Sequence, residues 1–204
     1  MEELSAPSPP EGLRQAHSAE LVIPWIGAGL SNAVSNKNLP DYRELILTCL
    51  HAAQADGIVI QDADVIYADV QRKSYKTAAM LLRRQLQENE FTRIIRSRLQ
   101  DDNPAPSLHH RILNLMEYRV YFTTNYDRVL DQILLPRPAV LTYRDHNTMR
   151  VIMDEQTQSV SQQVPYIFKL NGDVSAPPTI VLGQSSALGL YDRSTPLGLS
   201  LIHI

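Results

Sequence analysis

The chain has 204 residues, a length that fits one domain, and 44% of them are apolar and 20% charged, as in ordinary globular proteins. The formal net charge of −3 excludes a protein that binds polyanions by its overall charge. Its single cysteine, Cys49, excludes a disulfide framework and a zinc site made of several thiolates. The longest early apolar run, residues 21–26, is too short to cross a bilayer, and the segment before it is acidic where a secretory signal is basic. We therefore expect a cytoplasmic protein without a membrane partner.

The N-terminal region combines a polar arm with a short apolar run. Residues 1–19 are rich in Pro, Ser and Glu, which predicts a disordered arm. Residues 21–26 predict a strand that ends in the glycine turn Gly27-Ala28-Gly29. Pro24 lies within this run and has no N–H to donate, so a central place in a sheet is not expected for the strand.

A long helical region follows. Asp41 with Glu44 three residues later has the pattern of a capping box, which predicts the start of a helix that ends at Gly57. Residues 62–118 have the pattern of further helices, interrupted at residues 103–106 by two prolines. Candidate helix caps in this region are Ser74, Asn89 and Ser107.

The second half alternates short strands with helical segments. The predicted strands are residues 119–122, 140–143, 166–169 and 179–182. Buried-type strands separated by helices predict an α/β fold with a doubly wound, Rossmann-like parallel sheet. We place the domain at residues 20–182, with a helical insertion at residues 44–118. The pattern is lost beyond this range, and residues 183–204 are expected to be a truncated or non-native tail.

Polar segments follow three of the predicted strands. The turn at residues 27–29 could let a phosphate approach the backbone, although Asn32 stands where a dinucleotide fingerprint has its third glycine. Asn125 and Asp127 could hold ribose hydroxyls and a carboxamide, and residues 169–173 end in another turn. Each segment alone also fits a turn or a helix cap. Because parallel strands end at one edge of a sheet, the three together predict a binding site there.

These segments also carry a resemblance. Four motifs stand in the order of sirtuin signatures: Gly27-Ala28-Gly29-Leu30-Ser31, Pro40-Asp41-Tyr42-Arg43, Thr124-Asn125-Tyr126-Asp127 and Lys169-Leu170-Asn171-Gly172. Over about residues 21–182 the chain thus resembles the sirtuin family, and in detail it looks most like the sirtuin-like NAD-hydrolysing domains of prokaryotic antiviral defence proteins.

The resemblance implies NAD as the substrate and its hydrolysis to nicotinamide and ADP-ribose. It also implies a homo-oligomer or a larger defence assembly. The implied cofactor-binding residues are Gly27, Ala28, Gly29, Ser31, Asp41, Tyr42, Arg43, Thr124, Asn125 and Asp127. The implied catalytic residues are Asn125, which orients the ribose and the attacking water, Asp127, which holds the carboxamide, and Asn171, which bonds the ribose.

Two departures from the family pattern bear on the reaction. Sirtuin deacylases hold zinc with four cysteines, which this chain cannot supply, so we expect no metal and no protein deacylation. The family has a catalytic His where this chain has Asn171, and an amide cannot accept a proton. Positioning and electrostatics could still promote cleavage. His146, expected in the loop after a strand, is a candidate substitute base, although a lone histidine in a surface loop is more often only solvated. Two functions therefore remain: an NAD hydrolase, or a catalytically weak or inactive module that senses NAD or ADP-ribose.

A basic stretch gives a third function class. Residues 71–98 hold eight Lys and Arg residues against Glu88 and Glu90, which is compatible with a nucleic-acid surface. Few aromatic residues interleave with them, so solvated helix faces are the expected explanation and a nucleic-acid partner is not expected. The adjacent His109 and His110 point apart on a helix, which argues against a metal site.

Overall fold

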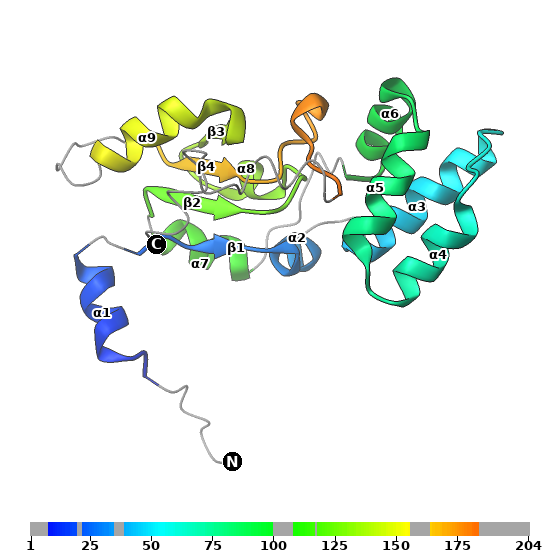
Figure 1. Cartoon of the computed structure of the whole chain (residues 1–204). Helices are drawn as coiled ribbons and strands as arrows, with labels where there is room; N and C mark the ends of the chain where they lie inside the picture. Colours follow the sequence, from blue (N-terminus) through cyan, green and yellow to red (C-terminus); the bar gives the residue numbers. More distant parts are fainter. Residues whose placement is uncertain are drawn as a thin grey trace, which may run out of the picture.

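The computed structural model describes residues 8–19, 22–34, 39–99, 108–116, 118–155 and 164–183. Its strands form one sheet in the order β1-β2-β4-β3, and every neighbouring pair is parallel (Figure 1). The strands are β1 (Trp25–Ile26), β2 (Val120–Thr123), β3 (Ala139–Thr142) and β4 (Tyr166–Lys169). Since β1, β2 and β4 are neighbours that run in one direction, the segments that follow them lie at one edge of the sheet.

Helices cover both faces of this sheet. Side chains alternate along β2, so Phe122 packs on one face with Met149 of α9, while Tyr121 packs on the other face beside α2, α7 and α8. In Figure 1, α9 lies above the sheet and α7 below it. These helices are α2 (Ala28–Val34), α7 (Leu108–Met116), α8 (Val129–Ile133) and α9 (His146–Glu155). The predicted doubly wound α/β fold is confirmed.

Four helices fill most of the range predicted for the insertion and form a group beside the sheet (Figure 1). They are α3 (Tyr42–Ala55), α4 (Ala63–Gln71), α5 (Tyr75–Gln85) and α6 (Glu88–Leu99). The predicted capping box starts α3: the Glu44 N–H donates to the Asp41 carboxylate at 2.7 Å, and the Asp41 N–H donates to the Glu44 carboxylate at 3.1 Å. This exchange satisfies two N–H groups that the first helical turn leaves open.

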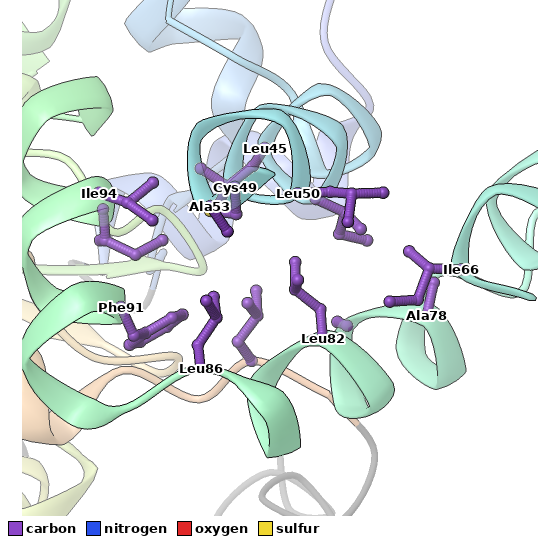
Figure 2. Packing of buried hydrophobic residues seen from close by; sticks show 14 of the residues in the cluster. Leu45, Cys49, Leu50, Ala53, Ile66, Ala78, Leu82, Leu86, Phe91 and Ile94 are labelled. Carbon is purple, nitrogen blue, oxygen red and sulfur yellow. The ribbon is translucent and has the colours of Figure 1, made fainter. Parts of the chain in front are cut away.

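The insertion has its own hydrophobic core, which also holds it against the sheet. Figure 2 shows Leu45 and Cys49 of α3 pointing toward Leu82 of α5 and Phe91 of α6. The same cluster includes Tyr126 from the segment after β2, and Val174 and Leu182 from the segments after β4. The insertion therefore packs directly on the segments that follow the strands.

Two strand predictions need correction. Among the described residues of the predicted strand 21–26, only Trp25 and Ile26 form β1, which lies at the edge of the sheet as Pro24 indicates. The Pro24 carbonyl still accepts from the Phe122 N–H at 2.9 Å. The strand predicted at 179–182 is absent from the described chain. Its place is taken by the turn η2 (Pro177–Thr179) and an irregular segment, because the Val181 N–H bonds to the Asn171 carbonyl rather than to a strand.

Some local predictions also differ. In the arm predicted to be disordered, α1 (Glu11–Ser18) forms without burying any residue, and Figure 1 shows it apart from the sheet. Asn89 lies inside α6 rather than capping it, and His146, expected in a loop, begins α9. Ser74 does precede α5, without a hydrogen bond from its side chain to the helix end. Ser107, the break at 103–106, the side chains of His109 and His110, and residues 184–204 lie outside the described residues.

Candidate functional site

A cavity of about 500 Å³ opens where β1, β2 and β4 end, between the sheet and the helical insertion. Its volume falls in the usual range for sites that bind small molecules and cofactors. The described residues that line it are Ala28, Pro40, Asp41, Tyr42, Leu45, Lys76, Leu99, Thr124, Asn125, Tyr126, Asp127, Asn171, Val181 and Gly183. The predicted edge of the sheet is thus hollowed, and the insertion supplies the opposite wall.

The structure brings many of the predicted site residues to this cavity. Those that line it are Ala28, Asp41, Tyr42, Thr124, Asn125, Asp127 and Asn171. Gly27, Gly29, Ser31 and Arg43 do not line it, and neither does the substitute base proposed from the sequence, His146, whose side chain is exposed on α9. The roles assigned to these residues stay predictions.

Ser31 connects the two polar side chains that follow β2. It is 1% exposed, and its Oγ accepts from Asn125 Nδ2 at 2.9 Å while donating to Asp127 Oδ1 at 3.0 Å. The backbone N–H of Val129 donates to the same carboxylate oxygen at 3.0 Å. Because Asn125 uses its NH₂ group on Ser31, its carbonyl oxygen is directed away from that hydroxyl. The amide and the carboxylate are therefore held in fixed orientations beside the cavity.

Asp127 has an unusual environment for a carboxylate. Burial raises the pKa of Asp127 above the usual value of an aspartate, and the effect outweighs the hydrogen bond from Val129, the nearby charge of Lys169 and the hydrogen bond from Ser31, which lower it. A carboxyl group with a raised pKa in a cavity changes its protonation state nearer to neutral pH than a surface aspartate does.

Asn171 lies at the end of β4, where the family motif has histidine. Its Nδ2 donates to the Thr124 carbonyl at 3.2 Å, which joins the ends of β4 and β2. Gly172 follows with φ of +94°, and a Cβ there would overlap the carbonyl oxygen of Thr179. Only glycine fits this turn. The turn thus presents an amide to the cavity at position 171, and an amide supplies hydrogen bonds but no general base.

Two polar lining residues, Lys76 and Tyr126, were not among the predicted site residues. Lys76 reaches the cavity from α5, and Tyr126 donates its hydroxyl hydrogen to the Val181 carbonyl at 2.9 Å. Among the described residues that line the cavity, Lys76 is the one with a cationic side chain. No local sequence pattern marks Lys76, because its place at the cavity depends on how α5 packs against the segment at Gly183. The two approach closely: a Cβ at Gly183 would lie 2.9 Å from the Cα of Met80, one helical turn after Lys76.

Two features are absent from the described residues. Over the described ranges, no three or more His, Cys, Asp and Glu side chains gather as a metal site would require. In the same ranges, no helix has the length and apolar character needed to span a membrane.

Comparison with known proteins adds a family likeness. Residues 119–199 match the sequence model of the SIR2-like domain family. This match begins just before β2 and includes Asn125, Asp127 and Asn171, and it supports a sirtuin-like family and an NAD-related activity. No curated protein matches the chain.

Proposed function

We propose that the cavity binds NAD and that the chain hydrolyses its nicotinamide–ribose bond to nicotinamide and ADP-ribose. The observation that carries this proposal is the pair Asn125 and Asp127, fixed by Ser31 on the wall of a cavity of about 500 Å³. The likeness of residues 119–199 to SIR2-like domains supplies the nucleotide class.

The polar groups of the cavity match the parts of NAD. The Asp127 carboxylate accepts a hydrogen bond from the carboxamide NH₂, and the Asn125 amide bonds a hydroxyl of the adjoining ribose. Lys76, at the wall made by α5, faces the negative diphosphate. These contacts hold the nicotinamide ribose against the end of β2.

Cleavage from this pose needs no side chain that takes a proton before the bond breaks. The C–N bond breaks with its electron pair leaving on nicotinamide, which departs as a neutral molecule, and positive charge develops on the ribose. The buried Asp127 carboxylate stabilises this charge. Water then adds to the ribose carbon and releases its proton to solvent. Asn125 and Asn171 contribute by positioning the ribose, which lowers the entropic part of the barrier.

The resemblance of the four motifs to defence proteins supports a cellular setting. We propose that the hydrolysis serves antiviral defence in the cytoplasm, and that the chain works as a homo-oligomer or in a larger assembly. Loss of NAD from the cell is the output that such an activity would deliver.

A second candidate function rests on Asn171. Because its amide replaces the histidine of the family motif, the cavity could bind NAD or ADP-ribose and report its level without cleaving it. Binding without nicotinamide release distinguishes this sensor from the hydrolase.

The test measures nicotinamide release and equilibrium binding of NAD on the same preparations. We expect release by the native chain, its loss in Asn125→Ala, and native behaviour in the control Asn147→Ala, which changes an exposed asparagine on α9 outside the cavity. Saturable binding without release, together with release gained in Asn171→His, would establish the sensor. The absence of both NAD binding and nicotinamide release would contradict both functions.

A further inference from the structure

A buried ammonium group lies next to the cavity without lining it. Lys169 is the last residue of β4 and is 1% exposed. Lysine is almost never buried without partners, because removing its charge from water is costly. The groups that contact the Lys169 ammonium therefore indicate the role of this residue.

The Lys169 ammonium joins three separate segments. Its Nζ donates to the main-chain carbonyl of Asp127 at 2.5 Å, lies 2.8 Å from Asp131 Oδ1, and lies 2.6 Å from Asp173 Oδ2. These partners belong to the segment after β2, to α8 and to the turn after β4. All three partner residues are buried.

The bond to the Asp127 carbonyl is the one that concerns the cavity. The segment of residues 124–127 carries two of the polar side chains on the cavity wall, Asn125 and Asp127. Ser31 fixes these side chains, whereas Lys169 fixes the main chain between them and α8. The Val174 N–H adds a bond to the Tyr126 carbonyl at 2.9 Å.

Stability alone does not account for this arrangement. A buried lysine with two carboxylates loses much hydration, and apolar residues of similar volume often stabilise a fold equally well. A main-chain carbonyl that points inward beside a ligand cavity, in contrast, requires a donor to keep its segment in place. Lys169 supplies that donor, and Asp131 and Asp173 balance its charge.

We propose that Lys169 is a positioning residue of the cavity: it holds residues 124–127 in the conformation that presents Asn125 and Asp127 to the nicotinamide ribose. The assignment of that ligand rests on the proposed function, but the effect on the segment itself does not. Loss of the Lys169 donor should therefore loosen residues 124–129 and lower kcat for NAD cleavage more than it raises KM.

The test compares a reference variant with a double variant built on it. Asp131→Asn is the reference, since it keeps Lys169 with its bonds to Asp127 and Asp173. The second variant, Lys169→Met with Asp131→Asn, removes one positive and one negative charge together, and leaves Asp173 with the N–H and hydroxyl of Ser175. Should the methionine variant fail to fold, Lys169→Gln with Asp131→Asn replaces it, because the glutamine amide can still donate a hydrogen bond.

Two readouts are measured on each folded variant. Amide hydrogen exchange of residues 124–129 reports on the segment without any ligand, and nicotinamide release gives kcat and KM separately. We expect exchange in this segment to be at least tenfold faster than in the reference, with unchanged exchange in α3, and kcat to fall about tenfold or more. The glutamine variant is expected to lie between the two.

Equal exchange in the segment for the reference and the methionine or glutamine variant would overturn the proposal, and so would equal kcat in a chain that cleaves NAD. If the native chain proves not to cleave NAD, the proposed function fails, while faster exchange of residues 124–129 still supports the role of Lys169 in shaping the cavity wall.

Discussion

Ser31 does not line the cavity, yet its hydroxyl touches both polar side chains that follow β2. One hydroxyl has a single hydrogen, which it gives to Asp127, and it accepts the amide hydrogen of Asn125. This chain of two bonds couples the orientation of the amide to that of the carboxylate, and it is buried from water. A change at Ser31 should therefore affect both side chains together.

We expect Ser31→Ala to lower kcat/KM for NAD about tenfold or more, because a buried hydrogen-bond partner that is removed costs roughly 1–3 kcal/mol. Steady-state nicotinamide release measures the effect. The control is Ser97→Ala, which removes an exposed hydroxyl that donates to the Ile94 carbonyl of its own helix, α6, outside the cavity lining. Equal loss in the two variants, or none in either, would argue against the Ser31 bridge.

The raised pKa of Asp127 gives a pH prediction. If the ionised carboxylate accepts the carboxamide hydrogen, activity falls as the pH decreases through a pKa that burial has raised above the usual aspartate value. The pH profile of kcat/KM should show this acid limb, Asp127→Asn should remove it, and Asp131→Asn should retain it. An acid limb that shifts in Asp131→Asn but not in Asp127→Asn would show that Asp127 does not cause it.

Protonation of Asp127 does not itself destabilise the fold. A folded-state pKa above the unfolded value means that Asp127 favours the folded state more as the pH falls through that pKa. The opposite holds for Asp173: burial alone would raise its pKa, but Lys169 and Ser175 together hold the pKa below the usual value. The stability that Asp173 adds is lost only as the pH falls through that lower pKa, in a more acidic range than the limb.

Among the elements, two glycines near the edge of the sheet, Gly172 in the turn after β4 and Gly29 in the first turn of α2, differ in what their surroundings require. Gly172 has a left-handed backbone, and a side chain there would collide with Thr179. A Cβ at Gly29, in contrast, meets no heavy atom of the described chain within 4 Å. Packing within the protein thus requires glycine at position 172 but gives no reason for it at position 29.

This contrast is testable with alanine at each turn. Gly29→Ala should keep or raise the melting temperature, since alanine favours α2 by up to about 1 kcal/mol, and should weaken NAD binding if the diphosphate approaches this backbone. Gly172→Ala should lower the melting temperature markedly. Thermal melts and NAD titrations measure both effects, and undiminished NAD binding by Gly29→Ala would remove the glycine turn from the site.

The insertion contributes charge to the cavity as well as a wall. We expect Lys76→Ala to raise KM for NAD roughly three- to tenfold with little change in kcat, because an exposed cation on the cavity wall binds the diphosphate equally in the ground and transition states. The effect should shrink at high salt. Arg84→Ala, an exposed basic residue on the same helix outside the cavity, is the control, and an equal effect of both variants would indicate only a general loss of charge.

For the whole molecule, local patterns predicted much of the fold. The β-branched and aromatic runs at residues 119–122 and 166–169 are strands because both of their faces are buried, and the capping box at Asp41 needs only neighbours in sequence. The run at residues 179–182 is also rich in β-branched residues but has no strand to pair with, since Pro177 and Pro178 turn the chain before it and its backbone bonds to Asn171. Composition does not report such long-range pairing.

The site residues also fall into two groups: those that the strand pattern predicts and those that only tertiary packing places at the cavity. Asn125, Asp127 and Asn171 were predictable at the cavity because parallel strands must end at one edge, and this follows from the strand pattern. Lys76 and the buried bonds of Lys169 depend on how the insertion and the turns pack against that edge, which no periodicity contains. Arg43 follows the lining residues Asp41 and Tyr42 in sequence, but its side chain is exposed and lies outside the lining, and its role at the diphosphate stays a prediction.

The proposed function requires NAD to occupy the cavity between the sheet edge and the insertion. A crystal structure of the chain grown with NAD would show whether it does. We predict NAD or ADP-ribose in the cavity, with the ribose beside Asn125 and the diphosphate beside Lys76. A nucleotide bound outside the cavity, or an empty cavity at saturating NAD, would show that this cavity is not the NAD site.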